Sequence, residues 1–503
     1  MPGCQGASST SSRSGESRSA PDVLETPSSA IFLLHSRPVS EFFQELRISG
    51  VISGVSFIAG TMVGSGIFMS PEWVLYHMGS PASSLVIWAS CGLLAMLGAL
   101  SYAELGTIIK ESGGEYIYIL RIFGPLPAFL FAYSSVILVR PGSLAAVCLS
   151  FAEYAVAPFY PGCASPQIVI KCTAAACILL LTIINCLNVK LVTSIMNIFT
   201  AAKLLALLVI AVGGLVLLAK GHTQNFQNGF QNTTAGIAPI GVAFYQGLWS
   251  YDGWNNLNYV TEELKKPEVT LPRAVMIAIP LVTCLYLLVN VSYFAAMTPS
   301  ELLSSGAVAV TWGDKVLGSW AWLISLFVVL STFGSSNGTF FSGGRLCYTA
   351  AREGHMVRAK RGSLQWFTSW SNTFFSCFFF NVICTAVAKL HLKMNVLSQK
   401  KENPGLSRSS GIQDLHVYLH RCLLSQVPIV IPIIVLVAAV YLVLAPIIDQ
   451  PKFEFLYLIL FTLSGIIFYL PLVRFKYHPR FLKRITLHLQ LLLEVAPTTR
   501  NKN

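Results

Sequence analysis

Small residues interrupt the first long apolar stretch of the chain, where residues 60–71 read GTMVGSGIFMSP. Gly64, Ser65 and Gly66 lower the free energy of leaving helical geometry. A break in a helix exposes backbone N–H groups on one half-helix and carbonyl groups on the other. The N–H end suits a carboxylate, and the carbonyl end suits an ammonium. The pattern therefore predicts a broken helix.

A second interruption lies in the sixth apolar stretch, where residues 244–256 read FYQGLWSYDGWNN. Gly247, Asp252 and Gly253 favour a break there. The alternative is that small residues only allow close helix packing. However, both breaks lie in the first helix of a five-helix half, and paired breaks indicate a transporter binding site. Because five is odd, the second half inserts upside down, which is the geometry of alternating access.

The composition indicates an integral membrane protein. Of 503 residues, 54% are hydrophobic and 11% are charged, against about 25% charged in soluble domains. These values exclude a disordered chain, a coiled coil and a soluble enzyme. The net charge of +12 fits cytoplasmic loops rich in Lys and Arg and does not require a nucleic-acid partner.

Membrane spans follow from the length of the apolar stretches, since a bilayer core of roughly 30 Å needs about 20 apolar residues per helix. Clear stretches lie at 49–70, 85–107, 126–150, 168–187, 192–219, 238–258, 274–297, 318–343, 427–448 and 454–474. A rougher one lies at 366–389. Residues 1–45 are rich in Ser, Pro and charge, which is typical of a disordered tail, and they lack the apolar region of a secretory signal.

Lys and Arg predict the orientation of these spans. The basic loops are 110–121, 260–273 and 345–361, whereas the loops 151–167 and 298–317 carry almost no Lys or Arg. The basic loops and the N-terminus are therefore expected to face the cytoplasm.

The expected organisation is all-helical, with two inverted five-helix repeats. After the tail at 1–45, the first repeat covers 46–220 and the second covers 236–426, of which 357–426 is divergent. Two C-terminal spans follow at 427–475, and a cytoplasmic tail ends the chain at 476–503.

Four side chains within the spans are candidates for recognising a charged substrate. Asp252 is either a counter-charge for a cationic substrate or a polar group bound by nearby backbone. Trp249 is an aromatic gate or ordinary packing. Lys203 is a fixed cation in the place of a coupling sodium ion, or it extends toward the lipid headgroups. Arg140 faces the bundle interior or the outer mouth.

The cysteines do not form a metal motif. The chain has 12 Cys, most of them in apolar stretches where they act as small hydrophobic residues. Cys163 lies in the external loop APFYPGCASPQ, so it is either one half of an intermolecular disulfide or a free thiol. We find no P-loop, HExxH or GxSxG motif and therefore expect neither an enzyme nor a cofactor.

Several stretches resemble the L-type amino acid transporter family, the light subunits of heteromeric amino acid transporters within the amino acid–polyamine–organocation superfamily. They are GTMVGSGIFMSP, ALSYAELGTIIKESGGEYIYI, FYQGLWSYDGWNNLNYVTEELKKP, ELLSSGAVAVTWGDK and GRLCYTAAREGHM. The resemblance covers about 48–356 and 427–496 and is strongest to the b(0,+)-type branch or an aromatic-preferring relative of it. It implies a leucine-transporter-type fold and sodium-independent obligatory exchange of amino acids at the plasma membrane.

The resemblance also implies roles for individual residues. It places the substrate carboxylate on the first break, which consists of Met62, Val63, Gly64, Ser65, Gly66 and Ile67. Asp252, with Gly253 beside it, would recognise cationic amino acids. Trp249 would be the gating aromatic, Lys203 the conserved lysine of the family's fifth span, and Cys163 the disulfide partner of a single-pass glycoprotein heavy chain. The implied exchange is cationic amino acid or cystine inward and neutral amino acid outward.

Residues 357–426 do not resemble the family. Either 366–389 is re-entrant, or 411–426 crosses the membrane with help, or the product is misassembled. Two other functions therefore stay open: a channel or receptor on the same fold, and a non-transporting product that only engages the heavy chain.

Overall fold

The computed structural model describes residues 50–160, 165–187, 189–355, 427–449 and 453–475. Every regular element within these ranges is a helix, so the all-helical prediction is confirmed for them. The predicted tails at 1–45 and 476–503, the divergent segment 357–426 with the rough span 366–389, and Cys163 lie outside the described residues. The repeat boundaries stay a prediction.

The helices of the first predicted repeat are α3 Val51–Met62, α4 Gly66–Met78, α5 Pro81–Ile108, α6 Glu115–Phe123, α7 Pro125–Ser134, α8 Arg140–Val156, α9 Gln167–Leu187 and α10 Val189–Ala219. Those that follow are α11 Ile237–Ser250, α12 Pro267–Ala296, α13 Pro299–Leu303, α14 Val308–Val316, α15 Trp322–Arg352, α18 Val430–Asp449 and α19 Phe453–Tyr469. Proline begins α5, α7 and α12, where its missing N–H has no helical partner to lose.

Each clear predicted span has a helical counterpart. Among the described residues, seven helices are long and apolar enough to cross a membrane, or eight when the bent pair α3 and α4 counts as one span. The sixth and the last predicted spans correspond to α11 and α19, of 14 and 17 residues. The third contains a feature that was not predicted, a π-helical turn at Ser135–Val139 between α7 and α8.

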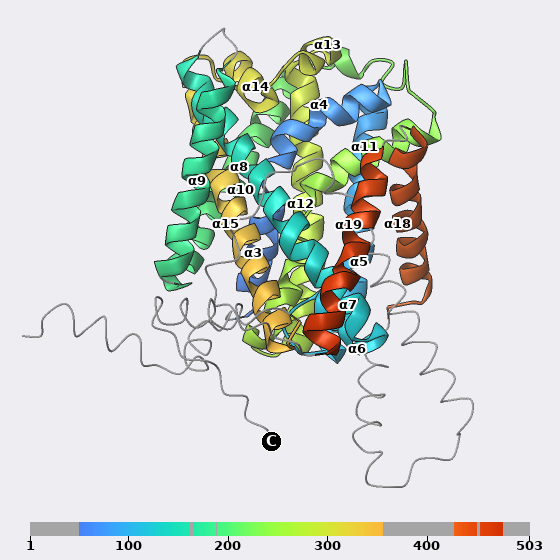
Figure 1. Ribbon diagram of the computed structural model, residues 1–503. Coiled ribbons are helices and arrows are strands. Elements are labelled where there is room, and N and C mark those ends of the chain that lie inside the picture. Colours follow the sequence, from blue (N-terminus) through green and yellow to red (C-terminus); the bar gives the residue numbers. More distant parts are fainter. Residues whose placement is uncertain (1–49, 161–164, 188, 356–426, 450–452, 476–503) are drawn as a thin grey trace, which may run out of the picture. The chain divides into compact units, whose positions relative to one another are not determined.

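The core of the bundle lies around α12, which packs against α3, α5 and α10. Helix α15 packs against α8 and α10, and α11 packs against α4 and α18. Figure 1 shows α9 along one side of the bundle and α18 and α19 along the other. The bent pair and α11 therefore lie between these outer helices, with the interruptions facing the interior.

Candidate functional site

The first break separates α3 from α4. Helix α3 ends at Met62 and α4 begins at Gly66, and their axes differ by 51°. Val63 has φ −73° and ψ 91°, which is not helical. Phe68 N–H donates to Ser65 O at 3.1 Å and closes the first turn of α4. The break predicted around Gly64 and Ser65 is thus present.

Side chains from three other helices bind the carbonyl end of α3. The contacts are Lys203 Nζ to Gly60 O at 2.5 Å, Ser335 Oγ to Thr61 O at 3.3 Å, Tyr286 Oη to Met62 O at 2.9 Å and Ser331 Oγ to Val63 O at 3.4 Å. The donors lie on α10, α12 and α15. Because buried carbonyl groups need partners, these side chains stabilise the break without a ligand.

The second break follows α11, which ends at Ser250. Asp252 N–H donates to Trp249 O at 3.3 Å. Gly253 then has φ +105°, a left-handed conformation that glycine adopts without steric strain. From Asn256 the chain continues as a 3-10 helix, η4, to Glu263. The predicted break at Asp252 and Gly253 is therefore present as well.

The two breaks meet. A Cβ atom on Gly66 would lie 2.5 Å from the Cα atom of Ser250, so only glycine allows this approach. Tyr286 Oη lies 2.9 Å from Met62 O and 2.8 Å from Ser250 O, and thus contacts a freed carbonyl of each break. Thr61 Oγ1 also donates to Gly253 O at 3.4 Å.

A small polar pocket lies where the breaks meet. Its lining residues are Thr61, Met62, Gly64, Ser65, Gly66, Ser143, Val147, Trp249, Asp252, Asn256, Ser335 and Thr339. The centre of a water molecule can occupy only about 20 Å³ of it, which is room for about one water. The pocket is therefore small in this conformation and would have to widen to hold anything larger than a water molecule.

Most of the predicted site residues lie at this pocket. Met62, Gly64, Ser65, Gly66, Trp249 and Asp252 line it, whereas Val63, Ile67, Gly253 and Lys203 do not. Val63 and Ile67 are fully buried, and Gly253 packs against Thr61. Lys203 is buried behind the first break and binds it through Gly60.

Sequence reasoning missed the contribution of α8 and α15. Ser143 and Val147 come from α8, and Ser335 and Thr339 come from α15. A signal for α15 was present, since Ser331, Ser335 and Thr339 are four residues apart and share one helix face. Nothing in the apolar sequence around Tyr286 indicated its contact with both breaks.

Arg140, whose position the sequence left open, faces the bundle interior. It begins α8 directly after the π-helical turn. Its guanidinium carbon lies 4.8 Å from the ring centroid of Tyr259 on η4, and its Nη1 lies 3.3 Å from Ser342 Oγ on α15. It is also near enough to Asp252 for the two charges to interact. The carboxylate of the pocket is therefore balanced by a protein cation.

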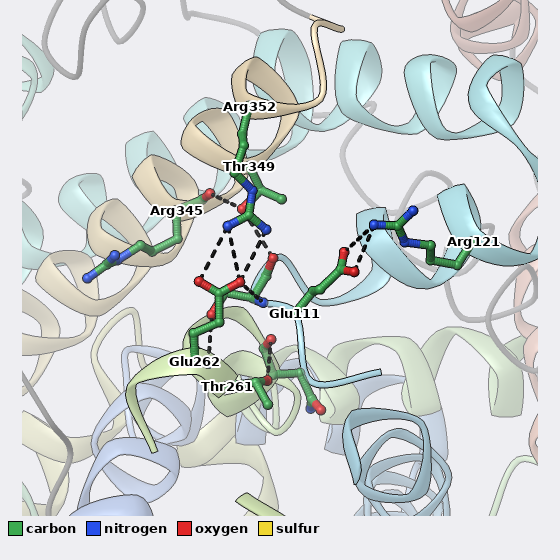
Figure 2. A network of polar contacts seen from close by, with 9 residues as sticks. Glu111, Arg121, Thr261, Glu262, Arg345, Thr349 and Arg352 are labelled. Carbon is green, nitrogen blue, oxygen red and sulfur yellow. Dashed lines mark hydrogen bonds and ion pairs between the residues drawn. The ribbon is translucent and has the colours of Figure 1, made fainter. Parts of the chain in front are cut away.

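Polar contacts close one end of the bundle, which we call the basic end because the Lys and Arg of the predicted cytoplasmic loops lie there. Figure 2 shows Arg352 of α15 against Glu262 of η4, with nitrogen–oxygen distances from 3.1 Å. The loop between α5 and α6 joins them, because Ser112 N–H donates to Glu262 Oε1 at 3.0 Å and Thr349 Oγ1 donates to Ser112 O at 3.3 Å.

Further ion pairs strengthen this closure. Arg345 of α15 binds Glu263 of η4 at 2.5 Å, and both side chains are buried. Arg121 binds Glu111 at 2.7 Å in the loop before α6. Together these contacts tie α15 and α6 to η4 at the basic end.

Two facing breaks around a pocket, inside a bundle of membrane-length helices, define a multi-pass membrane transporter. The amino acid permease family model matches residues 50–475. The chain is 48% identical to the human b(0,+)-type amino acid transporter 1 over 456 residues, which are 89% of this chain and 93% of the relative.

Other relatives match a shorter part of the chain. The human cystine/glutamate transporter is 45% identical over 63% of this chain and 64% of its own length. The human large neutral amino acids transporter small subunit 2 is 46% identical over 61% of this chain and 58% of its own length. The chain belongs to the amino acid permease family and is an amino acid transporter.

Proposed function

We propose that the protein is a sodium-independent exchanger that moves amino acids across the plasma membrane by alternating access. The observation that carries this proposal is the meeting of the two breaks at the pocket. Protein donors already bind the carbonyl end of α3, which leaves the N-terminus of α4 for the substrate carboxylate. The N-terminus of a helix attracts anions through its N–H groups and its dipole.

Sodium independence is supported by Lys203. Its ammonium group donates to Gly60 O beside the first break, and it is almost completely buried. A fixed cation that binds a freed carbonyl leaves no need for a sodium ion at that position. Removal of sodium from the medium should therefore leave exchange unchanged.

The charge of the transported side chain depends on Asp252 and Arg140. In the first candidate function, Asp252 acts as the counter-charge for a cationic amino acid, and cystine or neutral amino acids are the other substrates. This substrate must compete with Arg140 for the carboxylate.

A second candidate function follows from Arg140 itself. A cation one helical turn before the pocket residue Ser143 favours an acidic side chain, which would compete with Asp252 for the guanidinium group.

We propose that Cys163 forms a disulfide with a single-pass glycoprotein heavy chain, as its external loop and the family resemblance favour. Cys163 lies outside the described residues, so the support comes from the sequence. Cys163→Ser should abolish the large band of the complex on a non-reducing gel. Persistence of that band would point to another linkage.

Counterflow tests the transport proposal. Proteoliposomes that contain the full chain and its heavy chain are loaded with unlabelled arginine, cystine, leucine or glutamate, and labelled amino acid is added outside. An exchanger accumulates label only when substrate is present inside. Flux that does not need internal substrate would indicate a channel. If no flux is measured although the gel still shows the complex with the heavy chain, the protein only engages the heavy chain and does not transport.

A further inference from the structure

A pair of thiols lies directly behind the pocket, between α8 and α9. Cys148 and Cys177 are both free and buried. They belong to one small cluster of buried residues, whose other members are Ala152, Ile170, Ala174, Leu181 and Phe333. This cluster plays no part in the proposed transport site.

The spacing of the cluster places the two thiols opposite each other. On α8, Leu144, Cys148 and Ala152 are four residues apart, and on α9, Ala174, Cys177 and Leu181 are three and four apart. Residues at these spacings share one helix face. The helices are consecutive spans and pack against each other. Both thiols belong to the cluster buried between them, so they lie together at this helix interface.

The surroundings favour a ligand that needs two sulfur atoms and little else. Among the described residues, no group of three or more His, Cys, Asp or Glu side chains could hold a metal ion, which argues against a four-coordinate zinc site. Soft metal ions prefer thiolate ligands. Ser336 Oγ of α15 lies 3.7 Å from Cys148 Sγ and is the nearest polar group recorded for this thiol.

We propose that Cys148 and Cys177 form a binding site for a two-coordinate thiophilic cation, with Hg²⁺ as the probe. Each thiol loses one proton and forms one mercury–sulfur bond, so that two protons are released and no oxidant is needed. The bridge would fix α8 to α9 beside Ser336. The preceding residue, Ser335, lines the pocket and donates to Thr61 O of the first break, so the bound cation should also inhibit transport.

The test uses the purified full chain, treated with HgCl₂ and then washed with an excess of a monothiol. Bound mercury is measured by elemental mass spectrometry. We expect Cys148→Ser, Cys177→Ser and the double variant to lose the same single mercury ion. The loss of either thiol removes the second, intramolecular bond and lowers the affinity by about a hundredfold or more.

Matched controls separate a bridge from two independent thiols. Cys172→Ser changes an exposed cysteine of the same helix α9 and should retain the mercury ion. Methylmercury binds only one sulfur atom and should be washed off the pair. The proposal would be overturned if each single variant lost a separate mercury ion and the double variant lost both. It would also be overturned if the pair retained methylmercury as well as it retains Hg²⁺. Cys177→Ala replaces Cys177→Ser if the serine variant does not fold, as judged by gel filtration.

Discussion

Single residues show why two breaks can form deep in a membrane bundle. Lys203, Tyr286, Ser331 and Ser335 each donate to a carbonyl that the first break frees. An unpaired buried polar group costs about 1–3 kcal/mol, so these donors decide whether the break is stable. The sequence predicted the breaks from glycine and serine and singled out Lys203, but it did not indicate that Tyr286 of a distant helix contacts the first break.

The position of Asp252 in the lining of the pocket supports the first prediction. Asp252→Asn should lower uptake of arginine about thirtyfold relative to leucine, because it removes the proposed counter-charge of the cationic side chain, and loss of one partner of such a charge pair costs about 2 kcal/mol or more. Uptake into proteoliposomes with matched protein content measures this ratio.

Arg140→Gln serves as the matched control for this charge pair. If acidic side chains are the substrates, this variant should lose glutamate uptake and Asp252→Asn should keep it. Equal loss of all substrates in Asp252→Asn would contradict a role in charge recognition.

At the scale of elements, the apolar stretches predicted the helices well, because each span must be hydrogen-bonded internally in lipid. The π-helical turn at Ser135–Val139 was not predicted. Arg140 follows this turn directly and contacts Tyr259 of η4 and Ser342 of α15. The sixth predicted span, 238–258, contains α11 and reaches the start of the 3-10 helix η4, and the predicted break lies between them. Side-chain contacts join η4 to its neighbours.

One of those contacts is the buried pair of Arg345 and Glu263, which joins α15 to η4. Arg345→Met should destabilise the protein by about 3–5 kcal/mol, because it leaves a buried carboxylate without its cation. Thermal unfolding in detergent measures the change. The double variant Arg345→Met with Glu263→Met should recover much of the loss, and a double variant as unstable as the sum of both single variants would argue against this pairing.

A histidine directly after α15 makes stability depend on pH. Burial lowers the pKa of His355 from 6.5 to about 4, and its Nδ1 lies 2.8 Å from Tyr116 Oη of α6. The unfolded chain therefore binds more protons than the folded chain between these two pH values. The contribution of neutral His355 to the free energy of unfolding is complete above pH 6.5 and is lost as the pH falls to about 4.

His355→Gln should flatten this part of the curve of melting temperature against pH. The matched control is His222→Gln, a substitution of an exposed histidine in the loop after α10, which should leave the curve unchanged. A curve for His355→Gln that still falls as steeply as that of the unchanged protein would contradict the assignment.

For the whole molecule, we expect the small pocket and the contacts at the basic end to belong to one conformation of the proposed transport cycle. The ties at the basic end join α15 and the loop before α6 to η4. If the basic loops face the cytoplasm, as their charge predicts, release of substrate into the cell requires these ties to break. The sequence predicted the order of the spans. It did not predict these polar contacts, since they join segments about 90 to 240 residues apart.

Glu262→Gln should loosen the basic end. Hydrogen exchange of residues 110–114 and 256–263 should rise by up to about fivefold, since an exposed ion pair contributes about 0–1 kcal/mol. The matched control is Glu301→Gln, which breaks an exposed pair between Glu301 of α13 and Lys315 of α14. Unchanged exchange in the first variant, or the same rise in both, would show that these contacts do not hold the end closed.

The hydroxyl of Tyr286 gives the breaks a mechanical link, because it contacts Met62 O and Ser250 O together. Neither unwound turn can swing away alone without leaving a bare carbonyl in the interior. We therefore expect a substrate that supplies its own hydrogen-bond donors to make this movement easier, so that an occupied site would change conformation more readily than an empty one.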